Sequence, residues 1–600
     1  MRRLTPLVRL APVGALCAWL PFAAPGARGQ EGPPEEALRA LYESTWEALL
    51  RLDPEFASQV GDARFQREWR DRSPEGAARL RGRMRAALDS LGAIDRDALA
   101  GAARVDYDVF EDFARTMVSA PEVEHVSVLS SYGYTPVSQM EGVHQSIAST
   151  LEAMPRRSVS DYEDILARLR AVDAPIEGTI ASLREELRAG IAIPAVVFAD
   201  VPRQVAALAP ADAADSPLLE GFRDMPESIP AAERERLTSE AEAAYAEHAL
   251  PAFGKLAAFL DEEYGPATRS TLALGDLPGG ADWYAHKVRT FTTTDMTPRE
   301  IHELGLGEVA RIRAQMERAI EDSGFEGSFD EFTEFLRSDP RFYYRTAGEL
   351  LTGYRDIAKR ADPALVPLFG TLPRMPYGVK EIPAYSAPTN TTAYYNSGAH
   401  AAARPAWFYA NTYNLASRPK WEMEALSLHE AVPGHHLQIS IAQELEDFPE
   451  LRRHVPYNAF VEGWALYAET LGYEMGFYED PYSRYGQLSY QMWRAVRLVV
   501  DTGIHAFGWS REEAIDFFAR NSGKPEHDIA VEIDRYIVWP GQALGYMVGK
   551  LKFEELRRRA EERLGDDFDV REFHDRVLEN GAVPLSVLER HIDEWLGSVD

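Results

Sequence analysis

The sequence predicts a mainly α-helical protein with a small β-sheet, and three observations lead to that prediction. About 45% of the 600 residues are apolar, which is enough for a large packed core. Apolar residues recur at helical spacing through most of the chain, with capping residues, glycines and prolines at the expected helix ends. Residues 372–415 differ, because five prolines there separate short aromatic and threonine-rich runs that are typical of strands.

The N-terminus has the order of a secretory signal peptide. Arg2 and Arg3 precede an apolar stretch over residues 10–27, and small residues follow, so we expect cleavage near Gly29. Three prolines break that stretch, which is short for a membrane anchor. A bulky leucine precedes Cys17, which is a poor context for lipidation. We therefore expect an exported protein, periplasmic or extracellular, that is soluble and has no membrane span.

Helical segments follow the predicted signal peptide (1–29). Ser160-x-x-Glu163 predicts a capping box, and residues 231–264 read as a helix with a kink at Pro251. Glycine and proline at residues 276–280 mark the clearest linker. Thr297 is expected to cap a further helix, because a proline and then a glutamate follow it. The predicted organisation is an N-terminal helical lobe over 30–280 and a catalytic lobe over 281–600, joined as one unit.

Charge and cysteine content exclude several classes of function. Lys and Arg number 64 against 95 Asp and Glu, a net charge of −31. This argues against a nucleic-acid or anionic-membrane partner, since both require a basic face. The single cysteine excludes a disulfide framework and a multi-thiolate metal site. A metal ion would have to be bound by histidines and carboxylates.

Three of the 14 histidines fall within eight residues, 429–436, with the sequence HEAVPGHH. A His-Glu pair ends one helical segment, and a His-His pair begins the next. The common zinc-hydrolase motif is His-Glu-x-x-His, because positions i and i+4 share a helix face, but position i+4 here is Pro433. A two-residue bulge at Pro-Gly would bring His435 to that face, whereas an ideal helix would bring His436 there. The spacing leaves both histidines open as the second ligand.

A third ligand is expected from a downstream helix. Glu462 lies in an otherwise apolar segment, where a carboxylate is costly unless it is paired or bound to metal. Glu469 is seven residues further, on the same helix face, and is a possible partner for a ligand histidine. Two histidines and one carboxylate suit a catalytic zinc ion (Zn2+), which keeps one position open for water. Glu430, beside the first ligand, would then take the water's proton and pass it to the leaving amine.

Oxyanion donors are expected on the C-terminal helices. Tyr546 lies in a segment that Pro540 is expected to start as a helix, and His505 lies on an apolar helix; an ordinary core role is the alternative for both. An aromatic strand near residue 395 could expose an edge that pairs with an extended peptide. The predicted substrate-binding residues are Tyr395, Asn396, Arg535, Gln542 and His436.

Three blocks resemble the signature segments of the DUF885 family: 429–438 (HEAVPGHHLQ), 462–469 (EGWALYAE) and 540–546 (PGQALGY). The resemblance covers nearly all of the chain after the predicted signal peptide. It places the chain in the zincin-like metallopeptidase clan, which is similar to the angiotensin-converting-enzyme, oligopeptidase and thermostable carboxypeptidase groups. It implies a two-lobed helical fold with a deep cleft and the small sheet near the active site. It also implies Glu430 as base and His429, His435 and Glu462 as ligands, favouring His435 over His436.

The first hypothesis is therefore an exported zinc metallopeptidase that hydrolyses short peptides. One alternative is a zinc hydrolase of non-peptide amides or esters, which nothing in the sequence excludes. Another is a degenerate, metal-containing peptide-binding protein, although Glu430 argues against a purely structural site, which would normally have four protein ligands.

Overall fold

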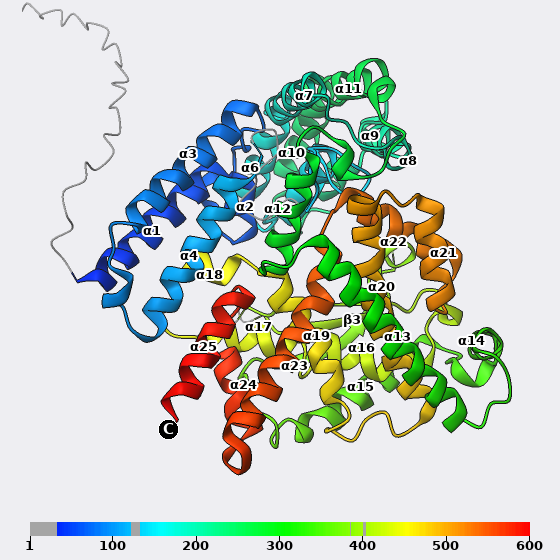
Figure 1. The fold of residues 1–600 in the computed structure, drawn as a ribbon. Helices are drawn as coiled ribbons and strands as arrows, with labels where there is room; N and C mark the ends of the chain where they lie inside the picture. The colour runs from blue at the N-terminus through cyan, green and yellow to red at the C-terminus, as the bar shows by residue number, and fades with distance from the viewer. Residues whose placement is uncertain (1–32, 122–131, 385, 400–403, 600) are drawn as a thin grey trace, which may run out of the picture.

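A computed structural model of the chain describes residues 33–121, 132–384, 386–399 and 404–599 (Figure 1). The predicted signal peptide lies outside the described residues. Within them the protein is mainly helical with one three-stranded sheet, as the sequence predicts. None of the helices described is both long and apolar enough to cross a membrane.

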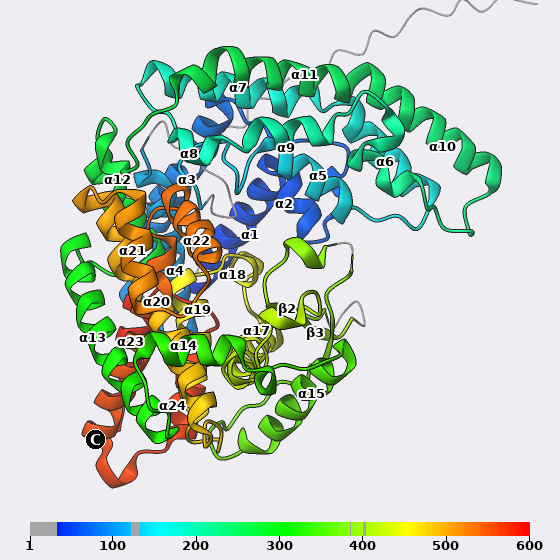
Figure 2. The same cartoon turned by 90° about the vertical axis from the view of Figure 1, so that its right-hand side faces the viewer.

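The N-terminal half begins with three long helices (blue in Figure 1) and continues into a layer that includes α7, α10 and α11, at the top of Figure 2. Its helices are α1 (Pro34–Leu52), α2 (Pro54–Gln59), α3 (Pro74–Leu91), α4 (Gly101–Ser119), α5 (Val143–Ala153), α6 (Val159–Arg170), α7 (Asp173–Arg188), α8 (Ala195–Phe198), α9 (Val201–Leu208), α10 (Ala231–Ala244), α11 (Leu250–Phe259) and α12 (Gly280–Thr292).

The C-terminal half contains the sheet and the longest helices. Its helices are α13 (Pro298–Asp322), α14 (Phe329–Ser338), α15 (Ala347–Ala364), α16 (Met423–Glu430), α17 (His435–Glu444), α18 (Glu450–His454), α19 (Asn458–Leu471), α20 (Pro481–Phe507), α21 (Arg511–Asn521), α22 (Glu526–Val538), α23 (Gly545–Leu564), α24 (Val570–Leu578) and α25 (Leu585–Ser598).

Local signals explain where several helices begin. Thr297 and Glu300 form the expected capping box at the start of α13. The capping box predicted at Ser160 is wrong, because Ser158 caps α6 and receives the N–H of Asp161. The sequence contains both patterns, two residues apart, and the earlier one satisfies the first backbone donors. Near Pro251 the helix continues through a π-helical turn at Tyr245–Ala249, since proline removes a backbone hydrogen bond there.

The sheet joins β1 (Tyr377–Glu381), β2 (Ala393–Asn396) and β3 (Ala406–Ala410) in the order β1-β3-β2. β1 runs parallel to β3, and β2 runs antiparallel to it, with Tyr395 opposite Phe408. The strands lie in the region where the sequence predicts them. β2 is an edge strand, so one side of its backbone is left for other partners.

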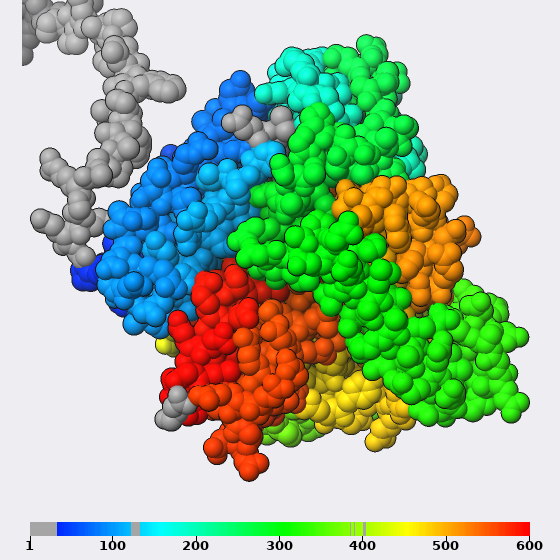
Figure 3. Space-filling view, viewed as in Figure 1, coloured from blue at the N-terminus to red at the C-terminus, as the bar shows by residue number. Residues whose placement is uncertain are grey.

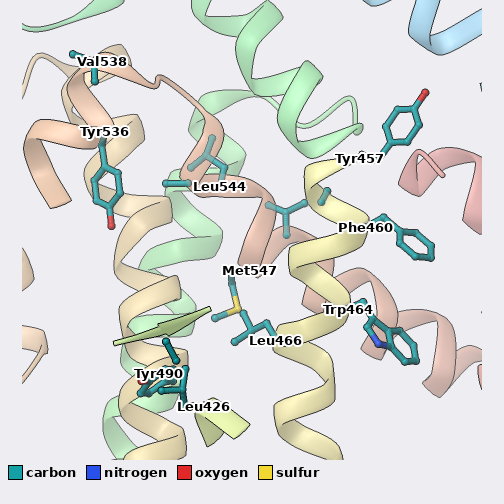
Figure 4. Packing of buried hydrophobic residues seen from close by; sticks show 14 of the residues in the cluster. Leu426, Tyr457, Phe460, Trp464, Leu466, Tyr490, Tyr536, Val538, Leu544 and Met547 are labelled. Atoms are coloured by element: carbon teal, nitrogen blue, oxygen red, sulfur yellow. The ribbon is translucent and has the colours of Figure 1, made fainter. Parts of the chain in front are cut away.

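Two close helix pairs, α13 with α20 and α19 with α23, form the frame of the C-terminal half. In α19 and α23 two glycines face each other, and a Cβ atom on Gly549 would come within 1.9 Å of Ala459 O. Leu466 of α19 and Met547 of α23 meet on the inner side, while Phe460 and Trp464 point away on the other side (Figure 4). The close approach brings Glu462, next to Gly463, near the start of α23.

The main hydrophobic cluster contains residues from both sides of the predicted linker, from Val105 to Leu596. A second cluster is built mainly from α1, α3 and α4. The C-terminal helix α25 packs against α4, and Figure 3 shows this red segment against the blue N-terminal helices. Arg590 of α25 pairs there with Asp108 of α4 at 2.9 Å. The C-terminal helix thus closes against the N-terminal helical region.

Candidate metal centre

Three side chains from three helices converge on one point. His429 in α16, His435 at the start of α17 and Glu462 in α19 each offer a ligand atom within 4.8 Å of the others. Glu462 Oε2 lies 3.7 Å from His429 Nε2 and 3.6 Å from His435 Nε2. These are the three residues proposed from the sequence as ligands, and the described part of the chain holds no other group of this kind.

The turn between the two histidines is set by Pro433 and Gly434. Helix α16 ends at Glu430, and α17 begins at His435, so the chain changes direction within four residues. A Cβ atom on Gly434 would lie 1.9 Å from His429 O, which only glycine tolerates. Pro433 O accepts a hydrogen bond of 2.9 Å from the buried indole N–H of Trp464. The turn is thereby held against α19, the helix that supplies Glu462.

His435 and His436 point in different directions, which separates the two alternatives for the second ligand. His436 Nδ1 lies 3.1 Å from the Tyr395 hydroxyl and 3.3 Å from Ser440 Oγ. Its ring is also 4.5 Å from the ring of Tyr377, on the sheet side. The cluster therefore contains His435, while His436 connects α17 to the sheet.

Glu469 holds the first histidine in place. Its Oε1 lies 2.9 Å from His429 Nδ1, and the residue is completely buried. This is the contact that the seven-residue spacing predicts. Because a ligand histidine usually donates its second N–H to a carboxylate, we assign the Nδ1 proton to His429 and leave Nε2 directed at the cluster.

The site electrostatics favour a charged carboxylate and a neutral second histidine. Burial raises the pKa of Glu462, but His429 and His435 outweigh it and bring that pKa down to about 2. Burial lowers the pKa of His435 to about 4, so its ring is neutral at pH 7 and offers a lone pair. Burial also lowers the pKa of His429, yet Glu462 and Glu469 raise it to about 9. A metal ion would have to displace that proton on binding.

Glu430 faces the same point from the end of α16. Burial raises its pKa to about 7, with His429 opposing the rise. Its Oε2 accepts a hydrogen bond of 2.9 Å from the backbone N–H of Tyr395. The free edge of β2 is therefore turned toward Glu430. Asn396, the next residue of β2, accepts a hydrogen bond from Arg404 instead.

The C-terminal block is arranged differently from the sequence expectation. The helix expected to start at Pro540 is wrong, because Gly541 takes a left-handed conformation and α23 begins at Gly545. Gln542 is occupied by Arg535 NH1 at 2.8 Å and by Asn458 Oδ1 at 3.1 Å. Burial, and then the charge of Glu462, raises the pKa of the Tyr546 phenol, so Tyr546 is the member of this block within electrostatic range of the cluster.

His505 is held by main-chain groups. Its Nδ1 accepts from Leu274 N at 3.0 Å, and its Nε2 donates to Tyr536 O at 2.9 Å. The ring is 1% exposed. With both nitrogens in use, it has no free N–H for a substrate, so its predicted role as an oxyanion donor is replaced by a structural one.

Two residues near the site were missed by the sequence reasoning. The charge of Arg494, on α20, acts on Glu430, His435 and Glu462. Tyr132, in the N-terminal half, also interacts with the site. Burial raises the pKa of its phenol to about 12, and the charges of Tyr546 and Glu462 add to the rise. An arginine within the apolar run of α20 was a usable signal. Tyr132 carried none, because its segment is far from the motif in sequence.

Comparison with known proteins matches a family model and several solved structures. A family model described as "Bacterial protein of unknown function (DUF885)" matches residues 54–592. The chain is similar to "the putative lipoprotein from Colwellia psychrerythraea", with 29% identity and a TM-score of 0.88 over 94% of this chain and 99% of that one. A second structure, "a putative lipoprotein of unknown function from Shewanella oneidensis", has 16% identity and a TM-score of 0.64, over 92% and 99%. No curated protein matches the sequence.

Proposed function

This chain belongs to the DUF885 family of bacterial proteins of unknown function, and from that premise we propose that it is a zinc-dependent peptidase acting on short peptides. The observation that carries the proposal is the convergence of His429, His435 and Glu462 beside Glu430. A place in the zincin-like clan, with a two-lobed cleft, is part of the same proposal.

The donor set fits zinc. Two imidazole nitrogens and one carboxylate oxygen are the ligands of many catalytic zinc sites, which keep a fourth position open. Ligand atoms about 2.0–2.1 Å from zinc at tetrahedral angles are about 3.3 Å apart. The distances of 3.6 and 3.7 Å from Glu462 to the two histidines are close to that spacing.

The bound zinc ion, Glu430 and strand β2 would have different roles in hydrolysis. Zinc, when bound, supplies Lewis-acid polarisation of the substrate carbonyl and acidifies water. Glu430 has a pKa near neutrality, so it can take a proton and later return it to the leaving amine. The Tyr395 N–H holds Oε2 of Glu430, which leaves Oε1 to carry that proton. The edge of β2 lies beside it, where an extended peptide could pair with the strand.

Export belongs to the same proposal. The order of positive, apolar and small residues in 1–29 supports it. The similar structure with 29% identity is described as a "putative lipoprotein", which also suits an exported protein. The context of Cys17 favours release of the chain over lipidation.

The test is peptide hydrolysis by the chain without residues 1–29. Removal of metal by a chelator should abolish hydrolysis, and zinc should restore it. Glu430→Gln should keep zinc and lose about 10²–10⁴-fold in turnover. Glu321→Gln, at an exposed position of α13, is the matched control and should behave as wild type.

Three results would contradict the proposal. Turnover that survives complete metal removal would exclude a metal mechanism, and full activity of Glu430→Gln would exclude this base. Metal bound by four protein ligands would favour a binding protein instead. Activity on small amides or esters without activity on peptides would move the assignment to a non-peptide hydrolase.

A further inference from the structure

Arg494 of α20 lacks the partner that a buried charge normally has. The residue is 6% exposed, and its one hydrogen bond in the structure runs from NH1 to Tyr490 O on its own helix, at 3.3 Å. Its Nε is buried and has no hydrogen-bond partner among the described residues. No carboxylate in the described part of the chain forms an ion pair with it. Such a charge is costly to bury.

Other buried arginines of the chain have more partners than Arg494, although Arg452 Nε and Arg168 NH1 are also buried without a hydrogen bond among the described residues. Arg452 pairs with Asp106 at 2.5 Å and also donates to Asn580 O. Arg168 has no carboxylate, but it donates to three main-chain carbonyls and to a serine hydroxyl. Arg494 differs from these two arginines because it has a single hydrogen bond and no ion pair among the described residues.

Further arginines lie along the same side of α20, although the charge of Arg494 also acts on Glu430 and Glu462. Arg497, one turn further along α20, and Arg535 of α22 share a single carboxylate, that of Glu532, at 3.2 and 3.0 Å. NH1 of Arg497 is buried without a partner among the described residues. The Arg497 guanidinium lies 4.4 Å from the ring of Tyr546. This group of arginines thus adjoins Tyr546, whose phenol is within electrostatic range of Glu462.

Two aromatic rings hold the Arg494 guanidinium in place. Its central carbon lies 4.8 Å from the ring centroid of Tyr490 and 5.2 Å from that of Trp493. Ring contacts of this kind stabilise a cation and restrict its orientation, but they supply no hydrogen-bond acceptor. The arginine is fixed in position while most of its donors stay unused, which is the arrangement expected of a group that awaits an anion.

We propose that Arg494 binds the C-terminal carboxylate of a peptide substrate, so that the protein removes residues close to a free C-terminus. This inference rests on the proposed function. Every peptide has a C-terminal carboxylate whatever its sequence. A single fixed arginine beside the reacting groups therefore selects chain ends without requiring a particular side chain. The substrate carboxylate would supply hydrogen-bond acceptors for the Arg494 N–H groups that have none among the described residues.

The test compares binding of one short peptide as its free acid and as its C-terminal amide. Calorimetry uses the zinc-loaded chain carrying Glu430→Gln, so that the peptide is not consumed. The free acid should bind about 10- to 100-fold more tightly than the amide, the range of a hydrogen bond to a charged group. Adding Arg494→Gln should reduce that ratio to about one, and Arg494→Lys should keep part of it. Arg318→Gln, at an exposed arginine of α13, removes the same charge and should keep the full ratio.

If the chain with Arg494 intact binds the free acid no more tightly than the amide, or binds neither peptide, the inference is overturned. This outcome does not depend on whether an Arg494 variant folds. An amidated peptide with an acidic side chain that binds as tightly as the free acid would assign Arg494 to side-chain recognition instead. A free-acid preference in a chain that hydrolyses no peptide would leave this inference standing and refute the proposed function.

Discussion

Replacing Glu469 by Gln should weaken zinc binding while the three ligands stay in place. Glu469 Oε1 lies 2.9 Å from His429 Nδ1 in a completely buried position. The carboxylate orients the ring and makes His429 Nε2 a stronger donor to a metal. The glutamine amide has nearly the same shape and keeps an acceptor oxygen, but it lacks the charge.

The size of the effect follows from that hydrogen bond. A hydrogen bond to a charged group contributes about 1.5–3 kcal/mol and a neutral one about 0.5–1.5 kcal/mol. The difference, about 1–1.5 kcal/mol, corresponds to about 5- to 13-fold in zinc affinity. Glu469→Ala should cost more, toward 100-fold, because it leaves the buried Nδ1–H of His429 without a partner.

Zinc affinity should be measured by competition with a chromophoric chelator at neutral pH. Glu474→Gln is the control: Glu474 lies just beyond the end of α19, pairs with Arg557 at 2.7 Å and is 40% exposed. It removes the same charge without touching His429. If Glu469→Gln binds zinc as tightly as Glu474→Gln, Glu469 does not support the ligand and the reasoning fails.

Two further predictions concern the second histidine and a buried aspartate. His435→Ala should abolish stoichiometric zinc, measured by metal analysis, whereas His436→Ala should retain it; the reverse result would make His436 the ligand. Burial raises the pKa of Asp501 to about 7, against about 3.9 in an unfolded chain, although Tyr284 and Gly541 donate to it. The unfolded chain therefore loses this proton first, and wild-type stability should fall as pH rises from about 4 to 7, by at most about 1.4 kcal/mol per pH unit. Asp501→Asn should lack this slope in urea unfolding, and parallel pH profiles would show that Asp501 titrates normally.

Helix starts could be predicted where several local signals agree. Thr297, with proline and glutamate after it, satisfied three preferences together, and the structure caps α13 there. At α6 two serines competed two residues apart, and the pattern did not distinguish them. Strand positions could also be read from residue type. The order β1-β3-β2 could not, since it depends on contacts between segments far apart in the chain.

Some residues of the candidate site could likewise be predicted from the sequence, and others could not. His429, Glu462 and Glu469 could be placed together because helical spacing and costly burial both act locally. The predicted role of His505 as an oxyanion donor was wrong, because a histidine on an apolar helix has the same sequence pattern whether it contacts a substrate or the main chain. Here its two nitrogens contact Leu274 N and Tyr536 O. Arg494 became significant only after folding brought α20 beside α16.

The Pro433-Gly434 turn explains how two histidines six residues apart, His429 and His435, can point to one site, as histidines four residues apart do in a continuous helix. In a continuous helix the fourth residue after a histidine lies above it, so both rings reach one metal ion. Here the helix ends, and the second ring is presented from the first turn of a new helix. Two features stabilise this turn. Gly434 has no Cβ atom that would clash with His429 O, and Pro433 O accepts a hydrogen bond from another helix. Trp464 provides the donor from two residues beyond Glu462. The same helix therefore supplies the third residue of the proposed metal site and supports the turn that sets the spacing of the two histidines.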